Sequence, residues 1–212
     1  MISFHKYKAG IFLIAALSLS GCASILPEPA PSKTVYRLSA SSSANAIPAA
    51  PNAIVMRVDR PTVTRPLAGY KIAVSPAENR ILAADGAIWA ENVSDLIQGS
   101  IMDVFASRGN IIGVLPVSGA RTELRLHLNV RNFEASYDQG EGNAPLAVVR
   151  YTATVVNASD RDLIGTYDVR KTFRADDNRV AEIVKALDMA NASAIHEITD
   201  WLESTMSQRA SS

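Results

Sequence analysis

Two stretches of the chain repeat their apolar residues at helical spacing. In residues 88–108 the apolar residues recur every three or four positions with polar residues between them, and Gly109 follows as a helix-ending residue. Gly99 lies inside this stretch, where we expect it to sit at a close packing contact. A second stretch of the same kind begins near Val180. The spacing predicts two amphipathic helices that pack side by side through similar apolar faces.

Alternation of apolar and polar residues predicts the strands. The clearest strand lies at residues 122–130, where leucine and valine alternate with polar residues. The phase of this alternation slips between Val130 and Phe133, which predicts a β-bulge. Two more long strands are predicted, at 146–156 and 162–173. Shorter strands are predicted at 34–38, 54–61, 70–74, 80–84 and 111–117.

This order of strands and helices indicates an α+β domain. We expect two layers, an antiparallel-rich sheet with both amphipathic helices packed on one face. The other face would then be polar and in contact with solvent. It would carry Arg125, His127 and Arg131, and the hairpin loop from Asp138 to Pro145 would lie at its end. We expect these residues to contact a partner.

The start of the chain has the pattern of a bacterial lipoprotein signal. Residues 1–8 hold two lysines and no acid, and residues 9–20 are apolar and uncharged. This apolar run of about a dozen residues is too short to span a membrane as a helix. The sequence LSGC at 19–22 resembles the lipobox, in which the cysteine takes a diacylglycerol. It predicts cleavage between Gly21 and Cys22 and lipidation of Cys22, the only cysteine in the chain.

Composition divides the chain into four segments. Residues 1–21 are the expected signal peptide, 22–33 a flexible proline-containing tether, 34–206 the folded domain and 207–212 a frayed polar tail. Lipoproteins retained at the inner membrane often carry Asp after the lipidated cysteine. Alanine follows it here, which favours the outer membrane.

Charge and candidate chemistry exclude several function classes. Without the two signal-peptide lysines the chain keeps 19 basic and 21 acidic residues, which is not the balance of a nucleic-acid-binding protein. His127 and His196 have no partners at metal-ligand spacing. We expect Asp176 and Asp177 to cap and begin the second helix, not to form a catalytic pair. The sequence contains no phosphate loop, nucleophile elbow or zinc-protease motif. It predicts a non-enzymatic protein without metal or cofactor.

Six pieces of the chain, taken in order, carry a family resemblance. They are YRLS at 36–39, YKIAV at 70–74, IWAENVSDLIQGSIMDVFASRG at 88–109, LRLHLNVRNFEA at 124–135, APLAVVRYTATVV at 144–156 and KALDMANASAIHEITDWL at 185–202. With these pieces the chain resembles the ABC-type transport auxiliary lipoprotein family, from Val35 to about Ser204. That family includes the paraquat-inducible C-type lipoproteins. The residues AADGAI at 83–88 depart from it, because the family often has an aromatic run and Arg before its Trp-Ala pair.

The resemblance implies a lipoprotein anchored in the outer membrane and facing the periplasm. It would be a non-enzymatic accessory subunit of an MCE-type lipid transport system that maintains the cell envelope. Its partners would be an MCE-domain protein and the associated ABC permease and ATPase, and a homo-oligomer is left open. The alternative is an independent ligand-binding or hydrolytic periplasmic lipoprotein.

Overall fold

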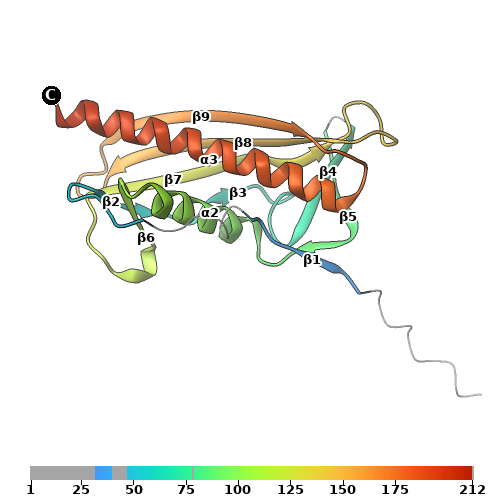
Figure 1. The fold of residues 1–212 in the computed structure, drawn as a ribbon, viewed down its shortest axis with the longest axis horizontal. Coiled ribbons are helices and arrows are strands. Elements are labelled where there is room, and N and C mark those ends of the chain that lie inside the picture. The colour runs from blue at the N-terminus through green and yellow to red at the C-terminus, as the bar shows by residue number, and fades with distance from the viewer. Residues whose placement is uncertain (1–31, 40–46, 78, 212) are drawn as a thin grey trace, which may run out of the picture. The chain divides into compact units, whose positions relative to one another are not determined.

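The computed structural model describes residues 32–39, 47–77 and 79–211. These residues form one mixed β-sheet with two helices on one of its faces (Figure 1). The α+β class expected from the sequence is confirmed. We call the face under the helices the inner face and the opposite one the outer face.

Three long strands form a continuous antiparallel part of the sheet. They are β7 (Leu124–Ser136), β8 (Leu146–Asn157) and β9 (Leu163–Arg174), and each pairs antiparallel with the next. Their positions follow the alternation in the sequence, although β7 continues beyond the predicted bulge to Ser136.

The alternation along β7 separates its two faces as predicted. Leu126, Leu128 and Val130 are at most 3% exposed and lie on the inner face. The register shifts between Val130 and Asn132, which confirms the bulge. Beyond the bulge, Phe133 returns to the core at 1% exposure. The extra residue therefore keeps the apolar side chains on the inner face along the whole strand.

The remaining strands are mostly short and lie on the other side of β7. They are β1 (Thr34–Tyr36), β2 (Ile54–Val58), β3 (Thr62–Val63), β4 (Lys71–Ala77), β5 (Arg80–Trp89) and β6 (Ile111–Val114). Strands β2, β3 and β4 each pair parallel with β7, β6 pairs parallel with β2, and β1 pairs parallel with β5. The long ladders are nevertheless antiparallel.

The first helix, α2 (Val93–Arg108), begins later than the sequence pattern predicted. The side chain of Asn92 caps it by accepting a hydrogen bond from the backbone N–H three residues on, and Gly109 ends it in the left-handed conformation. Ile88 and Trp89 belong to β5 instead. The helical period and the strand period both allow apolar residues at these two positions. The strand forms because β5 pairs with β1 and β4.

The second helix, α3 (Val180–Ala210), follows the predicted stripe. Its N-cap is Arg179, whose side chain makes no capping hydrogen bond, so the expectation that Asp176 and Asp177 cap this helix is wrong. Both aspartates pair with cations instead. Asp176 accepts from Lys185 Nζ at 2.6 Å, and Asp177 pairs with Arg179 at 2.8 Å.

The helix α3 also extends further than expected at its other end. It is helical to Ala210, through the first part of the segment 207–212 that the sequence suggested would fray. Within the described residues, no helix combines the length and the apolar composition needed to cross a membrane.

A buried polar network ties the two layers together. The Tyr151 hydroxyl on β8 donates to Asn191 Oδ1 on α3 at 2.8 Å, and Asn191 Nδ2 donates to Ser100 Oγ on α2 at 3.1 Å. Ser100 Oγ in turn donates to the Leu96 carbonyl at 3.0 Å. Tyr151, Asn191 and Ser100 are at most 2% exposed. Burial raises the pKa of the Tyr151 hydroxyl well above its ordinary value.

Strand β9 forms one edge of the described sheet, because it pairs with β8 alone. On its inner side Lys171 pairs with Glu197 of α3, and the Tyr167 hydroxyl donates to Glu197 at 2.9 Å. Trp201 of α3 stacks on Tyr167 with ring centroids 5.3 Å apart. Gly165 lets this ring approach the strand, since a Cβ there would lie 3.0 Å from Trp201. Polar and aromatic contacts therefore dock α3 onto the edge.

Candidate partner-contact surface

The outer face of β7 carries the polar residues predicted for it. Arg125, His127 and Arg131 alternate with buried leucine and valine residues, so they lie on the side away from the helices. His127 and Arg131 are exposed, and Arg125 is partly buried. Two of these residues, Arg125 and His127, belong to one cluster of charged side chains.

Asp59 is the centre of that cluster. It follows β2, and its side chain is only 12% exposed. Arg57 Nε donates to one carboxylate oxygen of Asp59 at 2.8 Å, and Arg125 Nη2 donates to the other at 2.9 Å. His127 Nδ1 lies 3.0 Å from the same oxygen as Arg125. Arg57 and Arg125 are directly opposite in register, so the carboxylate neutralises two like charges that would otherwise repel.

Arg131 lies at the bulge, beside a second polar group. Asn132 Nδ2 donates to Glu134 Oε1 at 2.7 Å. Glu134 is 8% exposed, and its other oxygen, Oε2, is buried without a hydrogen-bond partner among the described residues. An exposed cation at the bulge therefore precedes a largely buried acid by three residues along β7.

The loop between β7 and β8 is fixed by charge. Asp138 accepts hydrogen bonds from both terminal nitrogens of Arg174, at 2.6 and 2.8 Å. These bonds hold the pKa of Asp138 below its ordinary value. Pro145 is buried, and its carbonyl accepts from the Ala175 N–H at 2.9 Å. We therefore correct the predicted contact set by removing Pro145, since its side chain offers no surface to a partner.

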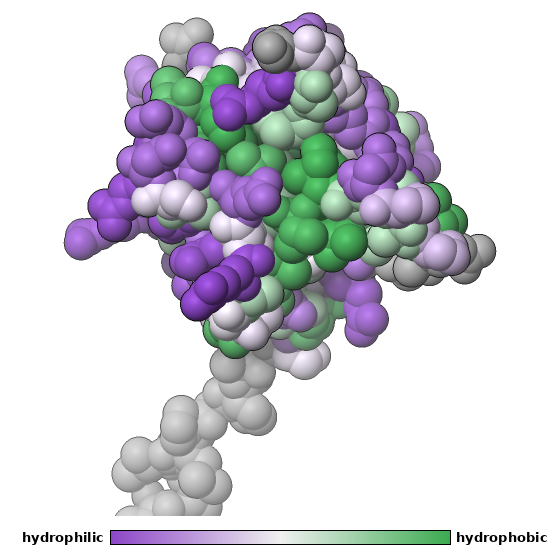
Figure 2. Space-filling view, turned by 90° about the vertical axis from the view of Figure 1, so that its left-hand side faces the viewer, coloured by the Kyte–Doolittle hydropathy of each residue, from purple (hydrophilic) through white to green (hydrophobic). Residues whose placement is uncertain are grey.

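The end of the domain that carries the β6–β7 connection has exposed apolar residues among polar ones. Val55 and Ile112 are register partners on the outer face, 37% and 38% exposed, and Val117 is 91% exposed. Figure 2 looks onto this end, which lies at the left in Figure 1, and shows hydrophobic surface bordered by hydrophilic residues. Exposed apolar surface with a polar border is typical of a protein contact.

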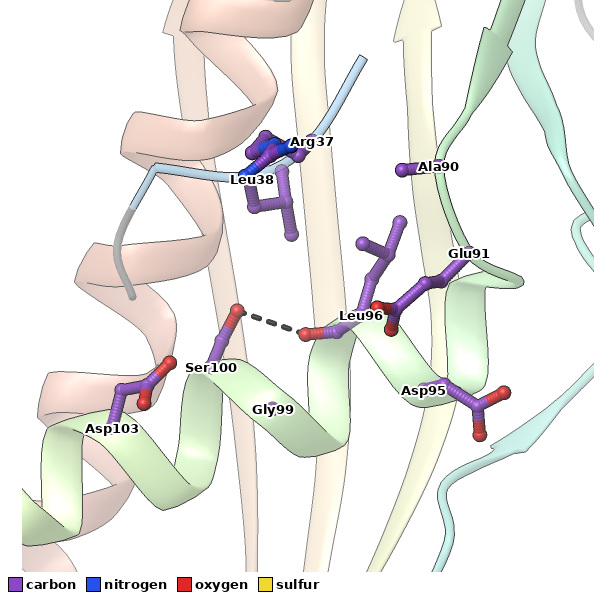
Figure 3. Close-up of a pocket in the computed structure, with 9 residues that line it drawn as sticks. All are labelled: Arg37, Leu38, Ala90, Glu91, Asp95, Leu96, Gly99, Ser100 and Asp103. Atoms are coloured by element: carbon purple, nitrogen blue, oxygen red, sulfur yellow. Dashed lines mark hydrogen bonds between the residues drawn. The ribbon is translucent and has the colours of Figure 1, made fainter. Parts of the chain in front are cut away.

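A hollow of about 350 Å³ lies between the segment after β1 and helix α2 (Figure 3). A Cβ added to Gly99 would meet nothing within 4 Å, so the close contact expected at this glycine is wrong, and the missing side chain leaves the hollow open. Arg60 Nε donates to Asp95 at 2.6 Å and lowers the pKa of that carboxyl, whereas burial raises the pKa of Asp103. The lining residues are Arg37, Leu38, Ala90, Glu91, Asp95, Leu96, Gly99, Ser100 and Asp103.

The outer face and the hollow both carry charged side chains. Within the described ranges, no three His, Cys, Asp or Glu side chains gather where they could hold a metal ion.

The predicted lipidation site Cys22 and the predicted cleavage site after Gly21 lie outside the described residues. The sequence had not indicated Asp59, because its role depends on β2 lying beside β7.

Comparisons with known proteins agree with this fold. The family described as "ABC-type transport auxiliary lipoprotein component" matches residues 36–199. A crystal structure of a Xanthomonas campestris protein described as DUF330 has 21% sequence identity and a TM-score of 0.71, and the alignment covers 84% of this chain and all of that one. A second crystal structure, of an uncharacterized protein, has 16% identity and a TM-score of 0.63, with coverage of 81% and 99%. At these identities the structures show a shared fold. The comparison with curated proteins found no match.

Proposed function

Because this chain belongs to the ABC-type transport auxiliary lipoprotein family, we propose that it serves an MCE-type lipid transport system. In this proposal it is an accessory subunit anchored in the outer membrane, facing the periplasm, and its partners are an MCE-domain protein and the associated ABC permease and ATPase. The observation that carries the proposal is the family match over residues 36–199, which covers α2, the three long strands and α3 up to Thr199.

The outer face suits the docking part of this role. Its Asp59 cluster is held by several charged contacts, so a partner would meet side chains that are already ordered. Ordering side chains at an interface costs about 0.5–1.5 kcal/mol each, and a preordered surface avoids part of that cost. The apolar end at Val55, Ile112 and Val117 adds surface of the kind found in the centre of protein contacts.

The hollow in Figure 3 supports docking over lipid carriage. Its lining includes Arg37, Glu91, Asp95 and Asp103, which are charged or titratable side chains. Acyl chains gain from apolar walls, and burying a charge against them is costly. We therefore propose that the domain contacts the transporter and that this hollow does not hold the transported lipid.

Docking is tested by native mass spectrometry of the purified full chain with and without the MCE-domain protein. We expect a complex, and no phospholipid bound at stoichiometric amounts to the chain alone. Arg131→Glu on the outer face should weaken the complex, whereas Arg209→Glu, which reverses an exposed charge on α3, should not. Stoichiometric phospholipid without any complex would contradict the docking role.

Anchoring is tested by labelling cells with palmitate. The Cys22→Ala variant should take up no label, because no other residue of the chain can form the thioether. Ser24→Ala is the matched control and should be labelled like the unchanged protein. Label retained in Cys22→Ala would show that the lipobox interpretation is wrong.

A further inference from the structure

A second pair of arginines lies face to face on the outer side of the sheet. Arg150 of β8 and Arg170 of β9 are direct register partners, and both are exposed. Like charges directly opposite each other destabilise a strand pair. Within the described part of the chain neither arginine has an acid within ion-pair distance.

The chain itself shows how such a pair can be stabilised. Arg57 and Arg125 are also opposed in register on the same face, and the Asp59 carboxylate bridges them with one oxygen toward each. Both pairs are opposed arginines on the outer face, the first in a parallel ladder and the second in an antiparallel one, and among the described residues only the first has a bridging carboxylate.

Two acids close in register to the second pair accept hydrogen bonds from other side chains. Asp168 lies two residues before Arg170 on β9, and its carboxylate accepts a hydrogen bond from Thr152 Oγ1. Glu134 lies on β7 and accepts from Asn132, which is the register partner of Arg150. One oxygen of each carboxylate thus accepts from a neutral side chain, Glu134 Oε2 has no hydrogen-bond partner among the described residues, and neither acid bridges the two guanidinium groups.

Arg131 adds a third positive charge to this part of the face. It lies at the bulge next to Asn132, it is exposed, and no described acid lies within ion-pair distance of it. We call Arg131, Arg150 and Arg170 the arginine row. A guanidinium group donates two parallel hydrogen bonds to a carboxylate, so a row of them can bind an acidic side chain from outside.

We propose that the arginine row binds a carboxylate from an acidic segment of a protein partner, in the way that Asp59 bridges Arg57 and Arg125. The bridge inside the chain is the reason to assign a carboxylate rather than a lipid phosphate. The proposal deepens the docking function above and rests on it for the identity of the partner. The acidic segment of the partner would attach to the outer face through its charge.

The site is tested with the full chain purified in a non-ionic detergent. The probe is a fluorescent peptide of alternating Glu and Gly, and its binding is followed by fluorescence anisotropy at low and moderate salt. We expect the Arg150→Gln/Arg170→Gln variant to bind the peptide at least about tenfold more weakly, since it loses two charge-assisted contacts. Added salt should weaken binding to the unchanged chain.

A matched variant and a second ligand make the result specific. Arg65→Gln/Arg121→Gln removes the same charge from exposed positions outside the row and should bind the peptide as the unchanged chain does. Equal loss in both variants would overturn the site, because it would show a general charge effect. Soluble dihexanoyl-phosphatidylglycerol that binds the row in preference to the peptide would overturn it in favour of a lipid headgroup.

The Arg150→Gln/Arg170→Gln variant should also keep its fold, because the two substitutions remove a repulsive pair. Thermal unfolding checks this. The same two variants are then measured with the MCE-domain protein. A complex that is indifferent to Arg150→Gln/Arg170→Gln would overturn the site and leave the docking function standing. If the unchanged chain forms no complex, the docking function fails, while the peptide measurement still decides whether the row binds a carboxylate.

Discussion

Replacing Asn191 with alanine should be among the most damaging single changes in this domain. Asn191 is fully buried and joins the Tyr151 hydroxyl of the sheet to Ser100 of α2. In Asn191→Ala the Tyr151 hydroxyl keeps its place in the core but loses its acceptor, which costs about 1–3 kcal/mol. Ser100 still donates to the Leu96 carbonyl, so it loses only the hydrogen bond that it accepted from Asn191. Losing that neutral hydrogen bond costs about 1 kcal/mol.

The expected loss is therefore about 2–4 kcal/mol, a large part of the roughly 5–15 kcal/mol that a domain of this kind has. Urea unfolding followed by circular dichroism measures it. Tyr151→Phe alone should cost about 1–3 kcal/mol, because it leaves the buried Asn191 Oδ1 without its donor while Asn191 keeps its bond to Ser100. In the double variant the stranded hydroxyl is gone, so adding Tyr151→Phe should recover part of the cost of Asn191→Ala.

This non-additivity is the decisive part of the measurement. If the two losses simply add, the Tyr151 hydroxyl does not depend on Asn191. The network would then not couple the sheet to the helices, and the reasoning would be refuted.

Three further changes test other parts of the structure. Gly99→Ala should stabilise α2 by up to about 1 kcal/mol in urea unfolding, since the new methyl group enters open space. Leu126→Asp should cost several kcal/mol in the same assay, whereas Arg131→Asp on the outer face should cost little; equal losses would mean that the faces are assigned wrongly. Because burial raises the pKa of Asp103, its charged form is disfavoured in the folded state. Asp103→Asn should therefore raise the melting temperature near pH 7, and the gain should vanish as the pH falls through the raised pKa toward the unfolded value.

Local patterns predicted the elements whose apolar residues have an unambiguous period. The long strands and both helices are of this kind, and the bulge at Val130 was visible as a slip in phase. The segment at Ile88 and Trp89 fits either period, and only its pairing with β1 and β4 makes it a strand. The parallel pairing of β2, β3 and β4 with β7 joins distant parts of the chain and has no local signal.

The candidate surface was predictable in part for the same reason. Alternation along β7 was enough to place Arg125 and His127 on the outer face. Their acidic partner Asp59 lies 66 residues before Arg125 in the chain, so the cluster depends on strand pairing that the sequence does not display. The opposition of Arg150 and Arg170 likewise depends on the register of β8 and β9, which the turn between them sets together with the apolar pattern of the two strands.

The docking of α3 onto β9 has a consequence for solubility. As an edge strand, β9 presents backbone N–H and C=O groups that a strand of another molecule could pair with, which is the first step of aggregation. Lys171 points inward at this edge and is held there by Glu197. An added strand would have to cover that ammonium group with its own backbone and side chains, and a charge covered in this way is costly. The ion pair that fastens the helix thus also protects the longest open edge among the described strands from self-association.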